Sequence, residues 1–274
     1  MRTRVGAVAL VAVVAGALAA CGDDGTVVGS APSRPQGKDE VVVQVLIAGG
    51  FVPVDVALGA VPSVTVLGDG TVISQAPVTA IYPGPAMPPL QAVTVPASTV
   101  DGLIRTAQEQ GLLGGDLDFG RPPVADAPDT TVTIVAGGTT HRHSANALGI
   151  TDDVAGPGLS AQQVKNRRAL QAFVEATSAL PPGERAWEPA EVAVYVVGAY
   201  TPDPQLPQPP QAWPLAAAPA ATGIRSCTLV SGGDVTTLLG ALRKANARTP
   251  WVINGVQQSL AFRPVVPGQP GCST

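Results

Sequence analysis

The chain has 274 residues, a formal net charge of −4, and 13% charged side chains, about half the usual share. Hydrophobic residues make up 45% of it, so it can bury a core, and disorder throughout the chain is excluded. Acidic residues outnumber basic ones, which excludes a surface that follows a phosphate backbone, and we expect no nucleic-acid partner.

The N-terminus has the layout of a secretory leader. Two arginines precede an uninterrupted run of small apolar residues, 5–18, and the uncharged stretch 5–22 is also compatible with a short membrane span. The run ends in Leu18-Ala19-Ala20-Cys21, which resembles the bacterial lipobox, where the cysteine thiol is acylated and becomes the first residue after cleavage. We therefore interpret residues 1–20 as a lipoprotein signal peptide and Cys21 as the lipid-modified (palmitate-bearing) residue.

This leader predicts the location and the partition of the chain. Two acyl chains suffice for lasting attachment, so we expect a protein anchored in the lipid bilayer of the cell membrane, on its extracytoplasmic face. Residues 21–39 are rich in Gly, Ser, Pro and Asp and predict a flexible tether. Residues 40–274 predict a single composite domain, for which 40–180 and 184–274 are alternative sub-units.

Two cysteines remain once Cys21 is assigned to lipid. Cys227 and Cys272 are an even pair in an oxidising compartment, which favours a disulfide over two free thiols. The bridge would close a loop of about 45 residues and contribute roughly 4 kcal/mol in the chain-entropy estimate. It would attach the C-terminal tail to the segment 224–230.

The folded part reads as strands and turns with a few helices. Three hairpins are predicted from their turn dipeptides; they span 63–75 (Asp69-Gly70), 130–147 (Gly137-Gly138) and 251–266 (Asn254-Gly255). Apolar runs predict strands at 41–47, 190–200 and 224–230, the second of them buried on both faces.

Helices are expected where apolar residues recur at helical spacing. They begin near Ser98 (paired with Asp101 in a weak capping box), near Ser160 and at Asp234, and Gly111 ends the first one. The proline-rich segments 82–90 and 201–219 predict extended loops. The fold class is therefore α+β: an antiparallel sheet of hairpins with two to three helices on one face, in two similar strand–helix–hairpin units.

A family resemblance agrees with this location. The stretches GGFVPV, LGDGTVI, YPGPAMPPL, VADAPDTTVT and WVINGVQQSLAFRPVVPG resemble uncharacterised secreted and lipid-anchored proteins of high-GC Gram-positive bacteria. The resemblance covers most of the chain after the leader. It implies location and architecture, and it implies no catalytic residue.

The only two histidines, His141 and His143, fall on one face of a predicted strand. A metal site needs three or four convergent ligands, and nothing in the sequence places a carboxylate beside the histidines. We interpret them as exposed polar residues with Arg142 opposite, and a weak metal site stays the alternative. The carboxylates that could complete such a metal site are Asp116, Asp118, Asp126 and Asp129. The candidate carboxylate pairs for glycoside hydrolysis are Asp116 with Asp118 and Asp152 with Asp153.

Sequence motifs for nucleophilic catalysis are missing, so we name no catalytic residue and no cofactor. Tyr82 and Trp213 stand on stiff proline-rich loops, where rigid aromatic rings either contact a ligand or fold back over the sheet. Folding back is favoured because the chain has few large side chains. We expect a non-catalytic binding or accessory module for an envelope protein or small ligand; an Asp/His hydrolase is the alternative.

The lipid anchor is directly testable. Replacement of Cys21 by serine removes the thiol that receives the diacylglyceryl group, so the protein should leave the membrane fraction and partition into the aqueous phase of a detergent extraction. Mass spectrometry of the wild-type N-terminal peptide should show an acylated Cys21. An intact N-terminus without acyl groups would contradict the prediction.

Overall fold

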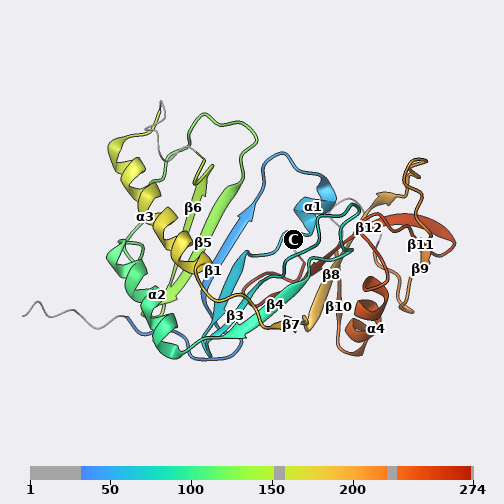
Figure 1. Cartoon of the computed structure of the whole chain (residues 1–274), viewed down its shortest axis with the longest axis horizontal. Helices are drawn as coiled ribbons and strands as arrows, with labels where there is room; N and C mark the ends of the chain where they lie inside the picture. Colours follow the sequence, from blue (N-terminus) through green and yellow to red (C-terminus); the bar gives the residue numbers. More distant parts are fainter. Residues whose placement is uncertain (1–31, 151–157, 221–226, 273–274) are drawn as a thin grey trace, which may run out of the picture. The chain divides into compact units, whose positions relative to one another are not determined.

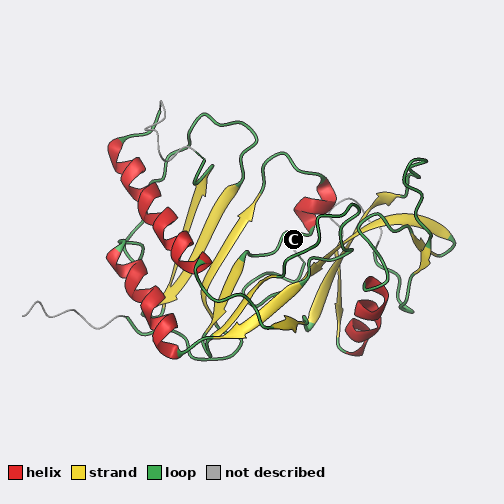
Figure 2. Ribbon diagram, viewed as in Figure 1, coloured by secondary structure: helices red, strands yellow, loops and turns green. Residues whose placement is uncertain are grey.

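The computed structural model describes residues 32–150, 158–220 and 227–272, which form two β-sheets and four helices (Figures 1 and 2). This confirms the α+β class, with more strands and one more sheet than the sequence predicted. The signal peptide, Cys21, Asp152 and Asp153 lie outside the described residues.

The first sheet is antiparallel, with seven strands in the order β6-β5-β1-β2-β3-β4-β7. Its two hairpins, β2–β3 and β5–β6, are the predicted ones, and Gly137 and Gly138 take the positive φ of a tight turn. The strands are β1 (Val41–Ala48), β2 (Val64–Leu67), β3 (Thr71–Gln75), β4 (Leu90–Thr94), β5 (Asp129–Ala136), β6 (Thr139–Asn146) and β7 (Arg185–Trp187).

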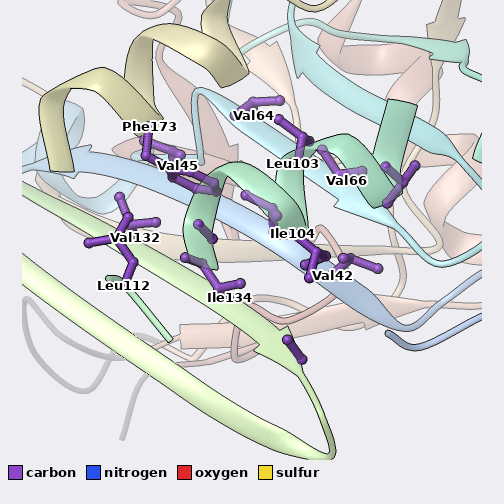
Figure 3. Close-up of a cluster of buried hydrophobic side chains, with 14 of the residues drawn as sticks. Val42, Val45, Val64, Val66, Leu103, Ile104, Leu112, Val132, Ile134 and Phe173 are labelled. Atoms are coloured by element: carbon purple, nitrogen blue, oxygen red, sulfur yellow. The ribbon is translucent and has the colours of Figure 1, made fainter. Parts of the chain in front are cut away.

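Two helices, α2 (Ala97–Glu109) and α3 (Ala161–Ser178), lie side by side over one face of this sheet (Figure 1). Leu103 and Ile104 of α2 and Phe173 of α3 are buried against the strands. Figure 3 shows these side chains in one cluster with the buried strand residues Val42, Val45, Val64, Val66, Val132 and Ile134.

Helix ends follow the sequence only in part. Gly111 (φ 74°) ends α2 as predicted. The expected capping box at Ser98 is wrong, because α2 begins after Pro96, and Ser98 lies inside the helix without a capping bond. The expected cap at Ser160 of α3 is confirmed, and Gln163 completes a capping box there. The expected cap at Asp234 is wrong, because Asp234 lies in the first turn of α4 (Gly233–Leu242), whose N-cap is Gly232.

The second sheet has five strands in the order β10-β8-β12-β11-β9, and α4 covers one face. β8 is interior and buried on both faces, as expected. The proline-rich segment 201–219 contributes a two-residue edge strand parallel to β11, which the sequence did not indicate. The strands are β8 (Glu191–Ala199), β9 (Gln211–Ala212), β10 (Cys227–Ser231), β11 (Trp251–Ile253) and β12 (Val256–Pro264).

Each sheet is covered by a segment that belongs to the other. The short helix α1 (Val54–Leu58), between β1 and β2, packs on β8 and β12 of the second sheet. In return Val266, just after β12, is buried among residues of the first sheet. These exchanged segments connect the two sheets within the compact unit Ala31–Thr274.

The C-terminal tail is attached at two points. The predicted disulfide joins Cys227 of β10 to Cys272, with 5.5 Å between their Cα atoms. Arg263, on β12, donates hydrogen bonds to the carbonyl oxygens of Pro270 and Gly271 and to the Tyr195 hydroxyl.

The expected tether ends earlier than residue 39. The Arg34 side chain is 4% exposed; its Nε donates to Asp101 Oδ1 at 2.7 Å and its Nη1 to the carbonyl oxygen of Gly68 at 2.7 Å. Ser33 accepts a backbone hydrogen bond from Gly137 in the β5–β6 turn. Composition predicted flexibility here because it takes no account of a single arginine that finds two acceptors, Asp101 and Gly68, in the folded part.

Arg34 should therefore stabilise the domain. Arg34→Met removes the donors of the buried Gly68 carbonyl and should lower the free energy of unfolding by about 1–3 kcal/mol. Arg105→Met, on the exposed face of α2, is the matched control and should change stability by less than about 0.5 kcal/mol. Urea denaturation measures the free energy of unfolding of both variants. An equal change in both would show that the contacts of Arg34, in the segment 32–39, contribute nothing to the stability of the domain.

Candidate functional site

Exposed apolar side chains gather on two loops. The segment 41–100 contains only two charged residues, Asp55 and Asp69. Eight large hydrophobic side chains are exposed on the segment that runs from the end of β1 through α1 and on the loop after β3, a clustering typical of interaction surfaces. We call them the apolar rim: Ile47, Phe51, Val52, Val54, Val56, Val78, Ile81 and Tyr82.

A groove of about 400 Å³ lies between these two loops. Leu260, Ala261 and Phe262 of β12 line it on the second sheet, Val56 lines it on α1, and Val78 lines it on the loop after β3. Pro85, Ala86, Pro88 and Pro89, from the segment 83–89 that we call the proline strap, also line it. The groove therefore lies where the two sheets meet and is mostly apolar.

The proline strap forms one wall of the groove as a loop and not as a strand, because prolines lack the N–H group that strand pairing requires. The strap is held at both ends by backbone hydrogen bonds of 2.9 Å. The Gly84 carbonyl accepts from the N–H of Ala247, between α4 and β11, and the Pro89 carbonyl accepts from the N–H of Ala76, just after β3. The strap thus connects the two sheets along one side of the groove.

The loop after β1, on the other side of the groove, is fixed by the close approach of its backbone to that of Asp126. Gly50 has φ 78°, and a Cβ there would lie 2.6 Å from the carbonyl oxygen of Asp126. That carbonyl also accepts from Phe51 N–H at 3.4 Å. Only glycine fits this position, and the contact presents the Phe51 ring to solvent, 89% exposed.

Asp55 is the one charged residue among those that line the groove, and the lining holds no Lys or Arg. Its carboxylate is half-buried and makes no hydrogen bond or ion pair with any residue in 32–150, 158–220 or 227–272. The groove therefore combines apolar walls with one unpaired negative charge, an arrangement suited to an apolar ligand with a cationic group.

The two aromatic residues singled out in the sequence differ in the structure. Trp213 folds back: its ring contacts Trp251 edge-on at 6.0 Å, and its indole N–H donates to the Ala217 carbonyl at 2.8 Å. Tyr82 is 73% exposed and belongs to the apolar rim. The interpretation of folding back thus holds for Trp213 and is wrong for Tyr82.

The interpretation of both histidines as exposed is wrong. His143 is 5% exposed; its Nε2 lies 2.7 Å from the Leu112 carbonyl oxygen, and its ring meets Phe119 edge-on. The reason is that α2 ends over this face, and Leu112, just past the helix, offers a carbonyl without a helical partner. His141 is half-buried, and Arg142, opposite, is exposed as expected.

The carboxylates do not converge on the histidines. Within the described parts of the chain, no three His, Cys, Asp or Glu side chains lie close enough to hold a metal ion. Asp118 accepts from Gly120 N–H and from the Gln163 side chain, bonds that lower its pKa below the ordinary 3.8, whereas a general acid needs a raised pKa. Asp116 and Asp126 are exposed, and Asp129 accepts from Asn146.

Comparisons with known proteins add no name to this site. No protein-family model matches the chain, and no curated protein matches it. Among the described helices, none has both the length and the hydrophobicity needed to cross a membrane.

The structural role of His143 separates the two histidines experimentally. His143→Ala leaves the Leu112 carbonyl without its partner and should lower the free energy of unfolding by about 1–3 kcal/mol. His141→Ala should change it by less than about 0.5 kcal/mol. Thermal or urea unfolding measures both. A rise in the wild-type melting temperature with micromolar Zn²⁺, lost in either variant, would instead indicate a metal site.

Proposed function

We propose that the protein is a non-catalytic lipoprotein, anchored on the extracytoplasmic face of the cell membrane, that binds a partner through the groove and the apolar rim. The observation that carries the proposal is the clustering of eight exposed hydrophobic side chains around one groove. Exposing so much apolar surface costs solvation free energy, which a bound partner would recover.

The chemistry of the lining supports binding more than hydrolysis. Hydrolysis by a nucleophile requires that side chain beside a base, and the groove is lined by apolar residues with one carboxylate and the Gln75 amide. His143 bonds to the backbone carbonyl of Leu112, at the end of α2, and is not among the residues that line the groove. Apolar clefts with a few polar groups are typical of binding sites.

The location is supported by the leader and by the disulfide. Arginines, apolar run and lipobox stand in the order of a lipoprotein signal peptide. A disulfide between Cys227 and Cys272 suits an oxidising compartment, such as the space outside the cell membrane.

The binding function is tested by site-specific photo-crosslinking in intact cells. A photo-reactive amino acid in place of Val78, in the groove lining, should give a covalent adduct. Val56→Arg introduces a charge into the same groove and should reduce the adduct by at least about tenfold, the equivalent of 1.4 kcal/mol. Val256→Arg is the control, since Val56 and Val256 are 55% and 56% exposed and only Val56 lines the groove.

Two results would contradict the proposal. One is the absence of any adduct from Val78 in cells that hold correctly folded protein. The other is an adduct that Val56→Arg and Val256→Arg reduce equally, because contact would then not involve the groove.

A further inference from the structure

We propose that the occupant of the groove is a polypeptide segment of another envelope protein, with a lysine or arginine among apolar side chains, and that its cation pairs with Asp55. This inference rests on the proposed function and adds the chemistry of the partner. Charge complementarity, the extent of the apolar rim and the position of the tether support it.

Asp55 supplies the charge complementarity. A purely apolar occupant would take this half-buried carboxylate out of water without a partner, which carries a large desolvation cost. A guanidinium or ammonium group would replace the lost hydration with a charge-assisted hydrogen bond. The groove therefore favours an apolar occupant that carries a positive charge and disfavours neutral or anionic ones.

The apolar rim extends beyond the groove. Phe51, Tyr82 and Ile81 are its most exposed members, at 89%, 73% and 67%, and none of the three lines the groove. A small amphiphile within about 400 Å³ would leave these side chains in water. A polypeptide lying along the groove covers them as well, and exposed aromatic rings are the usual anchors of protein interfaces.

A bilayer fits this face less well than a protein does. Anionic lipid surfaces attract basic segments. Here the exposed Asp126 adjoins Phe51 through its carbonyl, Asp55 lies in the groove, and neither the apolar rim nor the groove lining includes Lys or Arg. An anionic surface would therefore repel this face.

The position of the tether points the same way. Ser33 is bonded in the β5–β6 turn, beside the beginning of β1, whereas Phe51 follows the end of β1. The eight residues of β1 separate the two sites by roughly 26 Å at 3.3 Å per residue. The groove thus lies at the end of the sheet opposite to the one that Ser33 contacts.

A phage library of random linear peptides, selected against the acylated full-length protein in phosphatidylcholine nanodiscs, tests the inference. Selected peptides should combine apolar residues with Lys or Arg, and Val56→Arg should abolish their binding. Asp55→Asn should weaken the binding of an arginine-bearing peptide by about tenfold or more. The same peptide with its arginine replaced by glutamine should bind the wild-type protein and the Asp55→Asn variant equally. Asp69→Asn is the control, because Asp69 lies in the β2–β3 turn at the other end of the sheet.

The outcomes separate this inference from the proposed function. Groove-dependent peptides without a basic preference, or no enriched peptide at all, would overturn the inference, while the Val78 adduct in cells still decides the proposed function. A photo-reactive residue at Phe51 adds a second criterion: adducts with polypeptide are expected, and adducts only with lipid would overturn the inference in favour of a bilayer contact.

Discussion

The two sheets exchange covering segments, and this exchange fixes how they are joined. Because α1 leaves the first sheet to pack on β8 and β12, the loop after β1 must cross the junction, and its valines line a groove there. Because Val266 returns to the first sheet, β12 is held close enough to form the other wall. The groove is thus a product of the way the sheets are joined, and neither sheet would form it alone.

The proline-rich composition explains why the protein buries arginines. Twenty-eight prolines leave many loop carbonyls without a neighbouring N–H donor. Three arginines buried in the described part of the chain supply donors instead: Arg34 to the carbonyls of Gly68 and Pro35, Arg263 to two carbonyls of the tail, and Arg167 to that of Ala147. A guanidinium has five N–H groups and satisfies several acceptors from one position.

Local features were predictable from the sequence and long-range ones were not. The three hairpins rest on turn dipeptides such as Asn254-Gly255, whose positive φ angles are a local requirement, and the Ser160 capping box is equally local. The division into two sheets depends on pairing between distant strands, so the sequence suggested one. His143 was misjudged because the acceptor it meets, Leu112, is 31 residues away. The near absence of charge in 41–100 is a signal of the apolar rim that we did not interpret as one, and no local pattern indicates that β12 completes the groove.

The attachment of the tail bears on how the protein must be produced. Cys272 lies six residues after Val266, so the disulfide to β10 limits how far the segment that covers the first sheet can detach. In a reducing cytoplasm the bridge would not form, and the tail would rely on the hydrogen bonds of Arg263 and Gln44 and on the burial of Val266. A recombinant host that exports the chain before it folds should therefore yield a groove with both walls in place, whereas cytoplasmic expression invites misassembly of the two sheets.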